Sequence, residues 1–224
     1  MFQIGDFASF LAGRLTCIPR GDLFVSWSGG RLRPDSIKFG DSVEKESPNF
    51  LWFKIAKEYT KTEKDIYVCG TYNPPQNSIY FYPELFEELD NDIEKFSAFG
   101  SILLMGDFNS DNFCQEGNTI ITNDQSEFSL CALQRHSFDN ELNNHGKRLL
   151  EICRSADLTI MNGRSCGNSL GRPTFHGKSG VSVVDYAICD QDLFHSIANF
   201  VVKEPSSLSA VSYTHLTLPT IYSV

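Results

Sequence analysis

Residues 101–109 read SILLMGDFN, and this stretch decides the fold class. Its run of four apolar residues lies between Gly100 and Gly106, a pattern typical of a strand covered on both faces. Asp107 and Asn109 follow directly, and side chains two residues apart in an extended chain point to the same side. We therefore predict a buried strand that stops at Gly106, with a carboxylate and a carboxamide able to converge on one reacting atom or metal. The other interpretation is an ordinary turn, because Asp and Asn often bond their own backbone.

The neighbouring sequence predicts further strands and an amphipathic helix. Residues 49–56 (NFLWFKIA) and 65–72 (DIYVCGTY) are rich in residues that favour strands. A helix is expected to begin near Pro83 and to end at Gly100. Its apolar residues recur at intervals of three or four, namely Phe86, Leu89, Ile93 and Phe96. The order of strand, helix and strand favours a layered α/β fold.

The rest of the chain adds weaker signals. A helix is expected at 141–156, and strands are expected at 158–162, 181–189 and 198–204, with a weak strand at 23–27. Residues 111–140 are polar and are interpreted as a long surface insertion, a kind of segment that often carries function.

Composition limits the possible classes of protein. The chain has 224 residues, 41% of them hydrophobic and 21% charged, which fits one packed globular domain. Its formal charge of −9 argues against a general nucleic-acid binder, but not against an enzyme that engages phosphates through a metal ion. Seven scattered cysteines without a CxxC pair favour reduced, intracellular thiols. No run of 18 apolar residues predicts a membrane span.

One acidic residue and three histidines need separate interpretation. Asp185 lies within the apolar stretch VSVVDYAIC, so it either faces water or has a partner, for example a catalytic histidine that it orients. His136, His145 and His176 have polar, helical or loop-like neighbours, and we expect all three at the surface.

Five short motifs occur in a characteristic order. They are TYNPP at 71–75, MGDFN at 105–109, NNHGKRLLEIC at 143–153, PTF at 173–175 and VVDYAI at 183–188. Together they resemble the endonuclease/exonuclease/phosphatase superfamily, metal-dependent phosphodiesterases that include abasic-site endonucleases. Residues 149–164 resemble the endonuclease domains of non-LTR retrotransposons and their domesticated relatives. The resemblance covers about 50–209.

The resemblance implies a four-layer α/β/β/α sandwich and a DNA endonuclease that uses Mg²⁺ or Mn²⁺. It implies that the Tyr72 hydroxyl contacts the scissile phosphate and that Asp107 positions or deprotonates the attacking water. Asn109 would bind a phosphate oxygen or orient Asp107, and both Asp107 and Asn109 are candidate metal ligands. Asp185 would hold a catalytic histidine in the required tautomer.

The sequence also departs from the family pattern. The family's principal metal-ligand Glu has no counterpart, because Glu44 and Glu46 lie in a polar stretch without a buried strand before them. Ala210 and Val211 stand where the closing Ser-Asp-His motif has its Asp and His. His215 lies too far along the chain to replace that histidine, more than ~15 Å in an extended segment. We therefore expect weak metal binding and little or no nuclease activity.

These departures define the expected domain organisation. Residues 1–46 are expected to be a poorly defined segment, 47–209 a partial domain incomplete at both ends, and 210–224 a tail; both terminal segments are candidates for non-native sequence. Two other functions stay open, a phosphatase of the same superfamily acting on lipid or inositol phosphates and a non-catalytic binding module. No membrane association or protein partner is predicted. A nuclear location would follow from the resemblance alone, since the chain has no basic targeting cluster.

Overall fold

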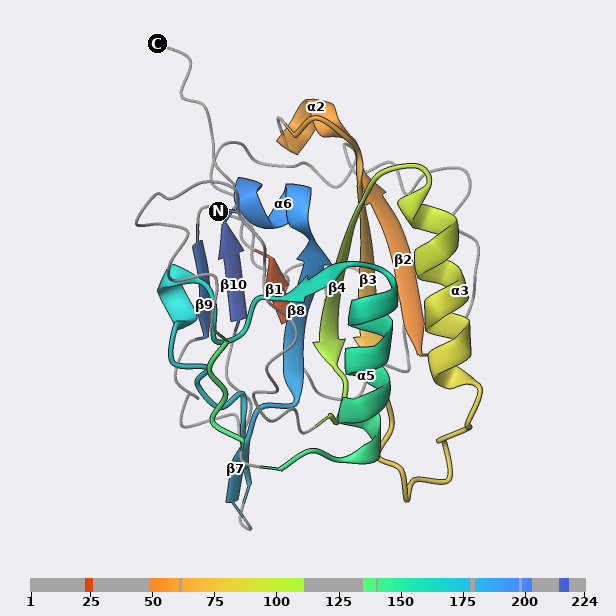
Figure 1. Ribbon diagram of the computed structural model, residues 1–224, viewed down its shortest axis with the longest axis vertical. Helices are drawn as coiled ribbons and strands as arrows, with labels where there is room; N and C mark the ends of the chain where they lie inside the picture. Colours follow the sequence, from red (N-terminus) through yellow and green to blue (C-terminus); the bar gives the residue numbers. More distant parts are fainter. Residues whose placement is uncertain are drawn as a thin grey trace, which may run out of the picture.

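The computed structural model describes residues 23–25, 49–60, 62–110, 135–139, 141–177, 180–197, 199–202 and 214–217. Its centre is a five-stranded sheet with the order β2-β3-β4-β8-β5 (Figure 1). These strands are β2 (Phe50–Ile55), β3 (Ile66–Tyr72), β4 (Ser101–Asp107), β8 (Asp185–Asp190) and β5 (Leu158–Ile160). A short helix, α2 (Lys57–Thr60), lies between β2 and β3 in the chain.

The central strands β3 and β4 are parallel, with helix α3 (Leu85–Ser97) connecting them. This confirms the predicted order of strand, helix and strand. β8 runs antiparallel to both β4 and β5, and β2 runs antiparallel to β3. As a result, three strand ends lie side by side at one end of the sheet: the C-terminal ends of β3 and β4 and the N-terminal end of β8.

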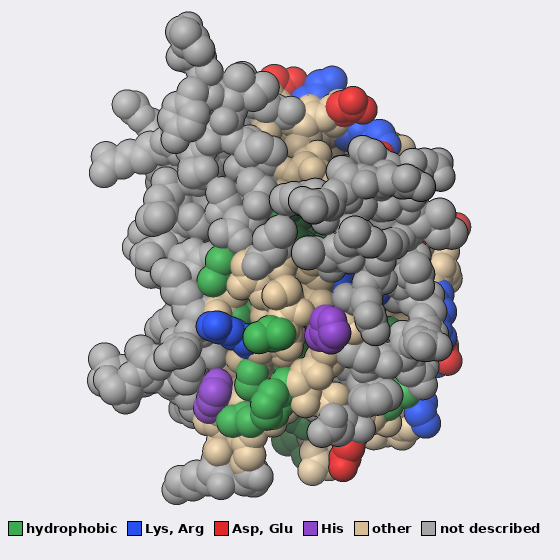
Figure 2. All heavy atoms as spheres, turned by 60° about the vertical axis from the view of Figure 1, so that its left-hand side comes forward, with side chains coloured by type: hydrophobic (Ala, Val, Ile, Leu, Met, Phe, Trp, Pro, Cys, Tyr) green, Lys and Arg blue, Asp and Glu red, His purple; other side chains and the backbone are tan. Residues whose placement is uncertain are grey.

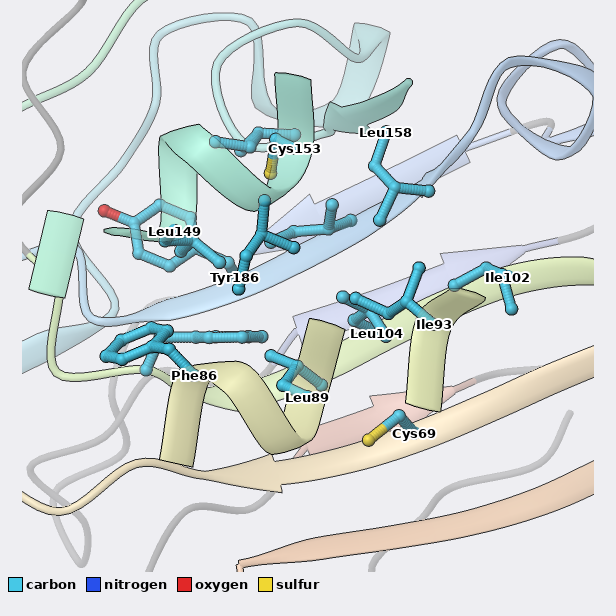
Figure 3. Close-up of a cluster of buried hydrophobic side chains, with 14 of the residues drawn as sticks. Cys69, Phe86, Leu89, Ile93, Ile102, Leu104, Leu149, Cys153, Leu158 and Tyr186 are labelled. Atoms are coloured by element: carbon cyan, nitrogen blue, oxygen red, sulfur yellow. The ribbon is translucent and has the colours of Figure 1, made fainter. Parts of the chain in front are cut away.

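Two amphipathic helices cover one face of this sheet, α3 and α5 (Asn144–Ser155) (Figure 1). The four apolar residues predicted for α3 are all buried. They pack with the sheet and with α5 in one cluster, where Leu104 and Tyr186 face Leu89 and Leu149 (Figure 3). The apolar spacing in the sequence therefore predicted this layer correctly.

The other face of the sheet packs against a second apolar cluster. It contains Met105 and Ala187 of the sheet and Leu193 of helix α6 (Gln191–Ser196). Phe200 and Val202 come from β9 (Asn199–Val202). β9 belongs to a three-stranded sheet with β10 (Thr214–Thr217) and β1 (Leu23–Val25). The described residues thus form a helical layer, the central sheet and a smaller sheet, which confirms the α/β class.

The smaller sheet joins segments from both ends of the chain. β1 falls within the weak strand predicted at 23–27, and it pairs in parallel with β10. β10 pairs antiparallel with β9. The proposed domain limits at 46 and 209 stay a prediction.

Two predicted elements differ from the structure. The single strand expected at 181–189 is two strands, β7 (Gly180–Ser182) and β8, with a break before Asp185. β7 pairs with β6 (Phe175–Gly177) in a hairpin, so His176 lies in a strand rather than a loop. The sequence pattern missed this break because the apolar residues continue across it.

The expected surface insertion at 111–140 is largely outside the described residues, which include only 135–139 of it. Arg135 and Asp139 are buried there, contrary to the expectation. Asp139 accepts hydrogen bonds from the backbone N–H of Val183 at 3.1 and 3.2 Å, and the guanidinium of Arg135 lies over the ring of Tyr186. This part of the segment therefore packs into the fold.

Three buried cysteines, Cys69, Cys153 and Cys189, carry free thiols. A short 3-10 helix, η2 (Cys166–Asn168), lies beside β9. Among the described residues no helix is long and apolar enough to cross a membrane.

Candidate active site

Near the C-terminal end of β4, Gly106 lies beside the backbone of β3 and has no room for a side chain. Gly106 pairs with Thr71 and has a φ of 151°. A Cβ at this position would lie 1.9 Å from the Thr71 carbonyl oxygen, so only glycine fits. The sequence analysis predicted that the strand stops at Gly106, but β4 continues through Asp107. The glycine is needed for the close contact between strands and does not end the strand.

Asp107 and Asn109 form a turn at the end of β4. Asn109 has a positive φ of 45°, so the chain is not extended here and the predicted alternation does not hold. The backbone N–H of Asn109 donates to Oδ1 of Asp107 at 2.9 Å, the self-bonding turn that was the alternative interpretation. Both residues nevertheless line the same cavity.

Asn73, which sequence analysis did not select, holds this turn in place. Its backbone N–H donates to the Asp107 carbonyl at 2.7 Å, and its carbonyl accepts from Nδ2 of Asn109 at 2.8 Å. Its Nδ2 donates to the carbonyl of Phe108 at 2.7 Å. Asn73 is fully buried. The TYNPP motif therefore supports the GDFN motif through its asparagine.

A cavity of about 360 Å³ opens at this end of the sheet. Its walls come from the loop after β3, the turn after β4, the start of α5 and the β6–β7 hairpin. Residues lining it include Pro75, Gln76, Asp107, Asn109, Asn143, His145, Phe175 and Ser182. The motifs at 71–75, 105–109 and 143–153 thus meet at one site.

Tyr72 and Asp185 flank Asp107 on the neighbouring strands. Tyr72 is the register partner of Asp107 on β3, and Asp185 is its partner on β8. Neither residue is among those that line the cavity. The backbone N–H of Asp185 donates to Oγ1 of Thr174 at 3.0 Å, and Oδ2 of Asp185 is buried without a hydrogen-bond partner. Asp185 is therefore the first residue of a buried strand, not a residue on a wet face.

The pKa values of the site carboxyls are raised. Burial, and then the charge of Asp185, raise the pKa of Asp107 to about 7, against the opposing effect of the Asn109 hydrogen bonds. Burial raises the pKa of Asp185 to about 6, opposed by Thr174. Burial and the charge of Asp107 raise the pKa of Tyr72. Two adjacent carboxyls that resist ionisation together are typical of a functional site.

His145 corrects the sequence interpretation of the histidines. His136 is exposed, as expected, but His145 is only 3% exposed and lines the cavity. It lies in the first turn of α5, whose N-cap Asn143 accepts from the backbone N–H of Gly146 at 2.7 Å. The available signal was helical spacing, because His145 precedes the buried Leu149 by four residues.

The chemistry of the site fits a divalent cation only in part. The two raised carboxyl pKa values show that negative charge is poorly neutralised there, and a bound cation would relieve this. However, the described residues contain no group of three His, Cys, Asp or Glu side chains that could hold a metal ion. Asp107, with the amide oxygen of Asn109, would be the protein ligands, and Mg²⁺ commonly completes its shell with water and phosphate.

Comparisons with known proteins agree with this architecture. No protein-family model matches the sequence, and a comparison with curated protein sequences finds no significant match. Among solved structures, the chain is similar to the endonuclease domain of TRAS1, a telomere-specific non-LTR retrotransposon, with 19% identity and a TM-score of 0.50 over 74% of this chain and 59% of that one. It is also similar to the AP endonuclease LMAP from Leishmania major, with 9% identity and a TM-score of 0.51 over 75% of this chain and 54% of that one.

The fold is therefore of the endonuclease/exonuclease/phosphatase type. The resemblance to retrotransposon endonucleases that the sequence motifs indicated is confirmed at the level of the fold. The chain spans 59% and 54% of the lengths of these two solved structures.

Proposed function

We propose that this domain is a divalent-metal-dependent phosphodiester hydrolase of the nuclease type that acts on DNA, with an incomplete catalytic set in this chain. The observation that carries the proposal is the meeting of Asp107 and Asn109 at one cavity, with Tyr72 and Asp185 beside them on the adjacent strands. These are the four residues that the family resemblance selects, and β3, β4 and β8 bring them together from distant parts of the sequence.

Asp107 is suited to act on the attacking water. Without a cation the pKa of Asp107 is about 7; a bound cation would lower it, so the ionised carboxylate would hold the cation and position the attacking water. The hydrogen bond from the Asn109 backbone N–H fixes Oδ1, so the orientation of the carboxylate is set by the turn. When bound, a divalent cation would supply positive charge against the anionic phosphodiester and would lower the pKa of the attacking water.

Turnover is expected to be slow in this chain. Oδ2 of Asp185 has no hydrogen-bond partner, so the carboxylate that would orient a catalytic histidine is not bonded to one in the described structure. The small set of described metal ligands also predicts weak cation binding. We therefore propose that the site binds a phosphodiester and a cation better than it turns them over.

The edge of the cavity favours nucleic acid over lipid or inositol phosphates. Among the described residues, those lining it include no Lys or Arg, the side chains that bind a multiply charged inositol phosphate. Instead, Phe175 lines the cavity and is 38% exposed, and Val181 on the same hairpin is 40% exposed. Apolar side chains gather at the surface on the side that carries β7 (Figure 2). Exposed aromatic side chains suit stacking on bases.

A gain-of-function variant tests the proposal. The double substitution A210D/V211H restores the Asp and His that the family motif has at these positions. We expect the unchanged chain to nick supercoiled plasmid DNA little or not at all with Mg²⁺ or Mn²⁺. The double variant should nick it in a metal-dependent manner, and adding Asp107→Asn should abolish the gain. Phosphate release from inositol phosphates by either protein, without nicking of DNA, would favour the phosphatase function instead.

A further inference from the structure

We propose that His145 is a phosphate-binding residue of this cavity and that its Nε2–H donates a hydrogen bond to a non-bridging oxygen of the bound phosphodiester. The inference rests on the proposed function and deepens it, because it assigns a ligand contact to a residue outside the four selected above. His145 lines the same cavity as Asp107 and Asn109. Its Nε2 is buried and has no hydrogen-bond partner.

The tautomer of His145 follows from its other ring nitrogen. Nδ2 of Asn73 lies 3.1 Å from Nδ1 of His145 and 2.7 Å from the carbonyl oxygen of Phe108. The Phe108 contact fixes the orientation of the Asn73 amide, since an amide oxygen in that place would face another oxygen. An amide nitrogen can only donate, so Nδ1 of His145 is the acceptor. In the neutral ring the proton is therefore on Nε2.

A neutral ring is consistent with the surroundings of His145. Burial lowers its pKa, and this effect outweighs a hydrogen bond with the Asn109 backbone that raises it. The rings of Phe81 and Phe86 lie 5.0 and 5.4 Å from its own. The two aromatic rings and the N-terminal turn of α5 hold the imidazole in one orientation. A buried donor without a partner is costly, roughly 1–3 kcal/mol, and such groups in native structures call for an explanation. A ligand oxygen in the cavity would satisfy it.

This assignment also excludes a role for Nε2 as a metal ligand. Only a deprotonated ring nitrogen binds a metal, and in this tautomer the lone pair is on Nδ1, which Asn73 occupies. His145 therefore complements a cation held by Asp107. The cation would neutralise one side of the phosphate, and the Nε2–H would bond the other.

The test uses the full chain with inorganic phosphate as the probe in the presence of Mg²⁺. Two-bond ¹H–¹⁵N correlations of the histidine rings should show His145 as the Nε2–H tautomer, with its signals shifting as phosphate is added. His145→Phe keeps an aromatic ring between Phe81 and Phe86 and removes the donor, so it should weaken phosphate binding by roughly tenfold or more. His145→Gln, which retains an N–H, should restore part of the affinity. The control His136→Phe changes an exposed histidine and should bind phosphate like the unchanged chain.

The outcomes separate this inference from the proposed function. An Nδ1–H tautomer, or equal phosphate affinity for His145→Phe and the unchanged chain, would overturn the role of His145 even if the A210D/V211H variant nicks DNA. Loss of phosphate binding in His145→Phe together with no DNA cleavage by any variant would support the phosphate contact and contradict the proposed hydrolysis. A circular dichroism spectrum and melting curve of His145→Phe close to those of the unchanged chain would show that the loss does not come from unfolding.

Discussion

Asp107 and Asp185 lie directly opposite each other on the antiparallel strands β4 and β8, and both carboxyls have raised pKa values. Like charges on directly opposed strand positions destabilise a sheet. A fold that only had to be stable would not place two acids together in this position. The pair is the feature that the proposed cation and phosphate site would account for, because a bound cation would offset the two charges.

The first prediction is a pH-dependent cost of this pair. The pKa values of both carboxyls in the folded protein, about 7 and about 6, lie above the ordinary value of 3.8. The folded state thus binds more protons than the unfolded state between about pH 4 and 7. The free energy of unfolding of the protein therefore falls as the pH rises through that window. Asp107→Asn should be more stable than the unchanged chain at pH 8, by roughly 2–4 kcal/mol.

Chemical denaturation across the pH range measures this effect. The advantage of Asp107→Asn in the free energy of unfolding should shrink toward zero below about pH 4, where Asp107 of the unchanged chain is protonated in both the folded and the unfolded state. Added Mn²⁺ should also reduce the advantage at pH 8, by stabilising only the chain that has the carboxylate. An advantage of Asp107→Asn that stays constant with pH would contradict the assigned pKa shift.

The second prediction concerns the close approach at Gly106. Gly106→Ala should destabilise the fold by about 3 kcal/mol or more, because the new Cβ would clash with the Thr71 carbonyl as well as strain the backbone. Gly180 is a matched control, since its φ is 147° but a Cβ there would meet nothing within 4 Å. Gly180→Ala should cost only the backbone strain, about 1–2 kcal/mol. Equal losses for the two variants in urea denaturation would show that the clash is relieved.

Much of the central sheet could be predicted from the sequence, for a physical reason. Side chains that are buried leave a periodic apolar signal in a single sequence. This holds for the apolar runs of β3 and β4 and for the α3 residues Phe86, Leu89, Ile93 and Phe96, which are buried. The residues of the candidate site were selected by motif, and Asp107 and Asn109 do line one cavity.

What the sequence did not reveal depends on tertiary contacts. Asn73 and His145 form the hydrogen-bond network behind Asp107, yet they are 72 residues apart. The helical spacing of His145 from Leu149 could indicate its burial, but not its partner. The break between β7 and β8 was missed because the apolar residues Val183 and Val184 continue the pattern although neither lies in a strand. Side-chain partners such as Asp139 for the Val183 N–H leave no local signal.

The third prediction tests the support that α5 gives to the site. The side chain of Asn143 caps α5 and also donates from Nδ2 to the carbonyl of Asn109 at 3.2 Å. Asn143→Ala should therefore lower the free energy of unfolding by about 1–2 kcal/mol and weaken phosphate binding. Asn144→Ala changes an exposed neighbour and should stay within about 0.5 kcal/mol of the unchanged chain. A loss of stability without any change in phosphate affinity would show that the cap is independent of the site.

The central claim is that Asp107 forms the core of a cation and phosphodiester site at the end of β4. Line broadening of backbone amide signals by Mn²⁺ tests it most directly, because it locates the ion without requiring turnover. Broadening should be centred on Asp107, Asn109 and the adjacent start of β8. It should increase when a short DNA duplex is added, because phosphate oxygens would complete the coordination of the ion. It should be lost in Asp107→Asn. Broadening that is centred elsewhere, or that persists in Asp107→Asn, would contradict the account.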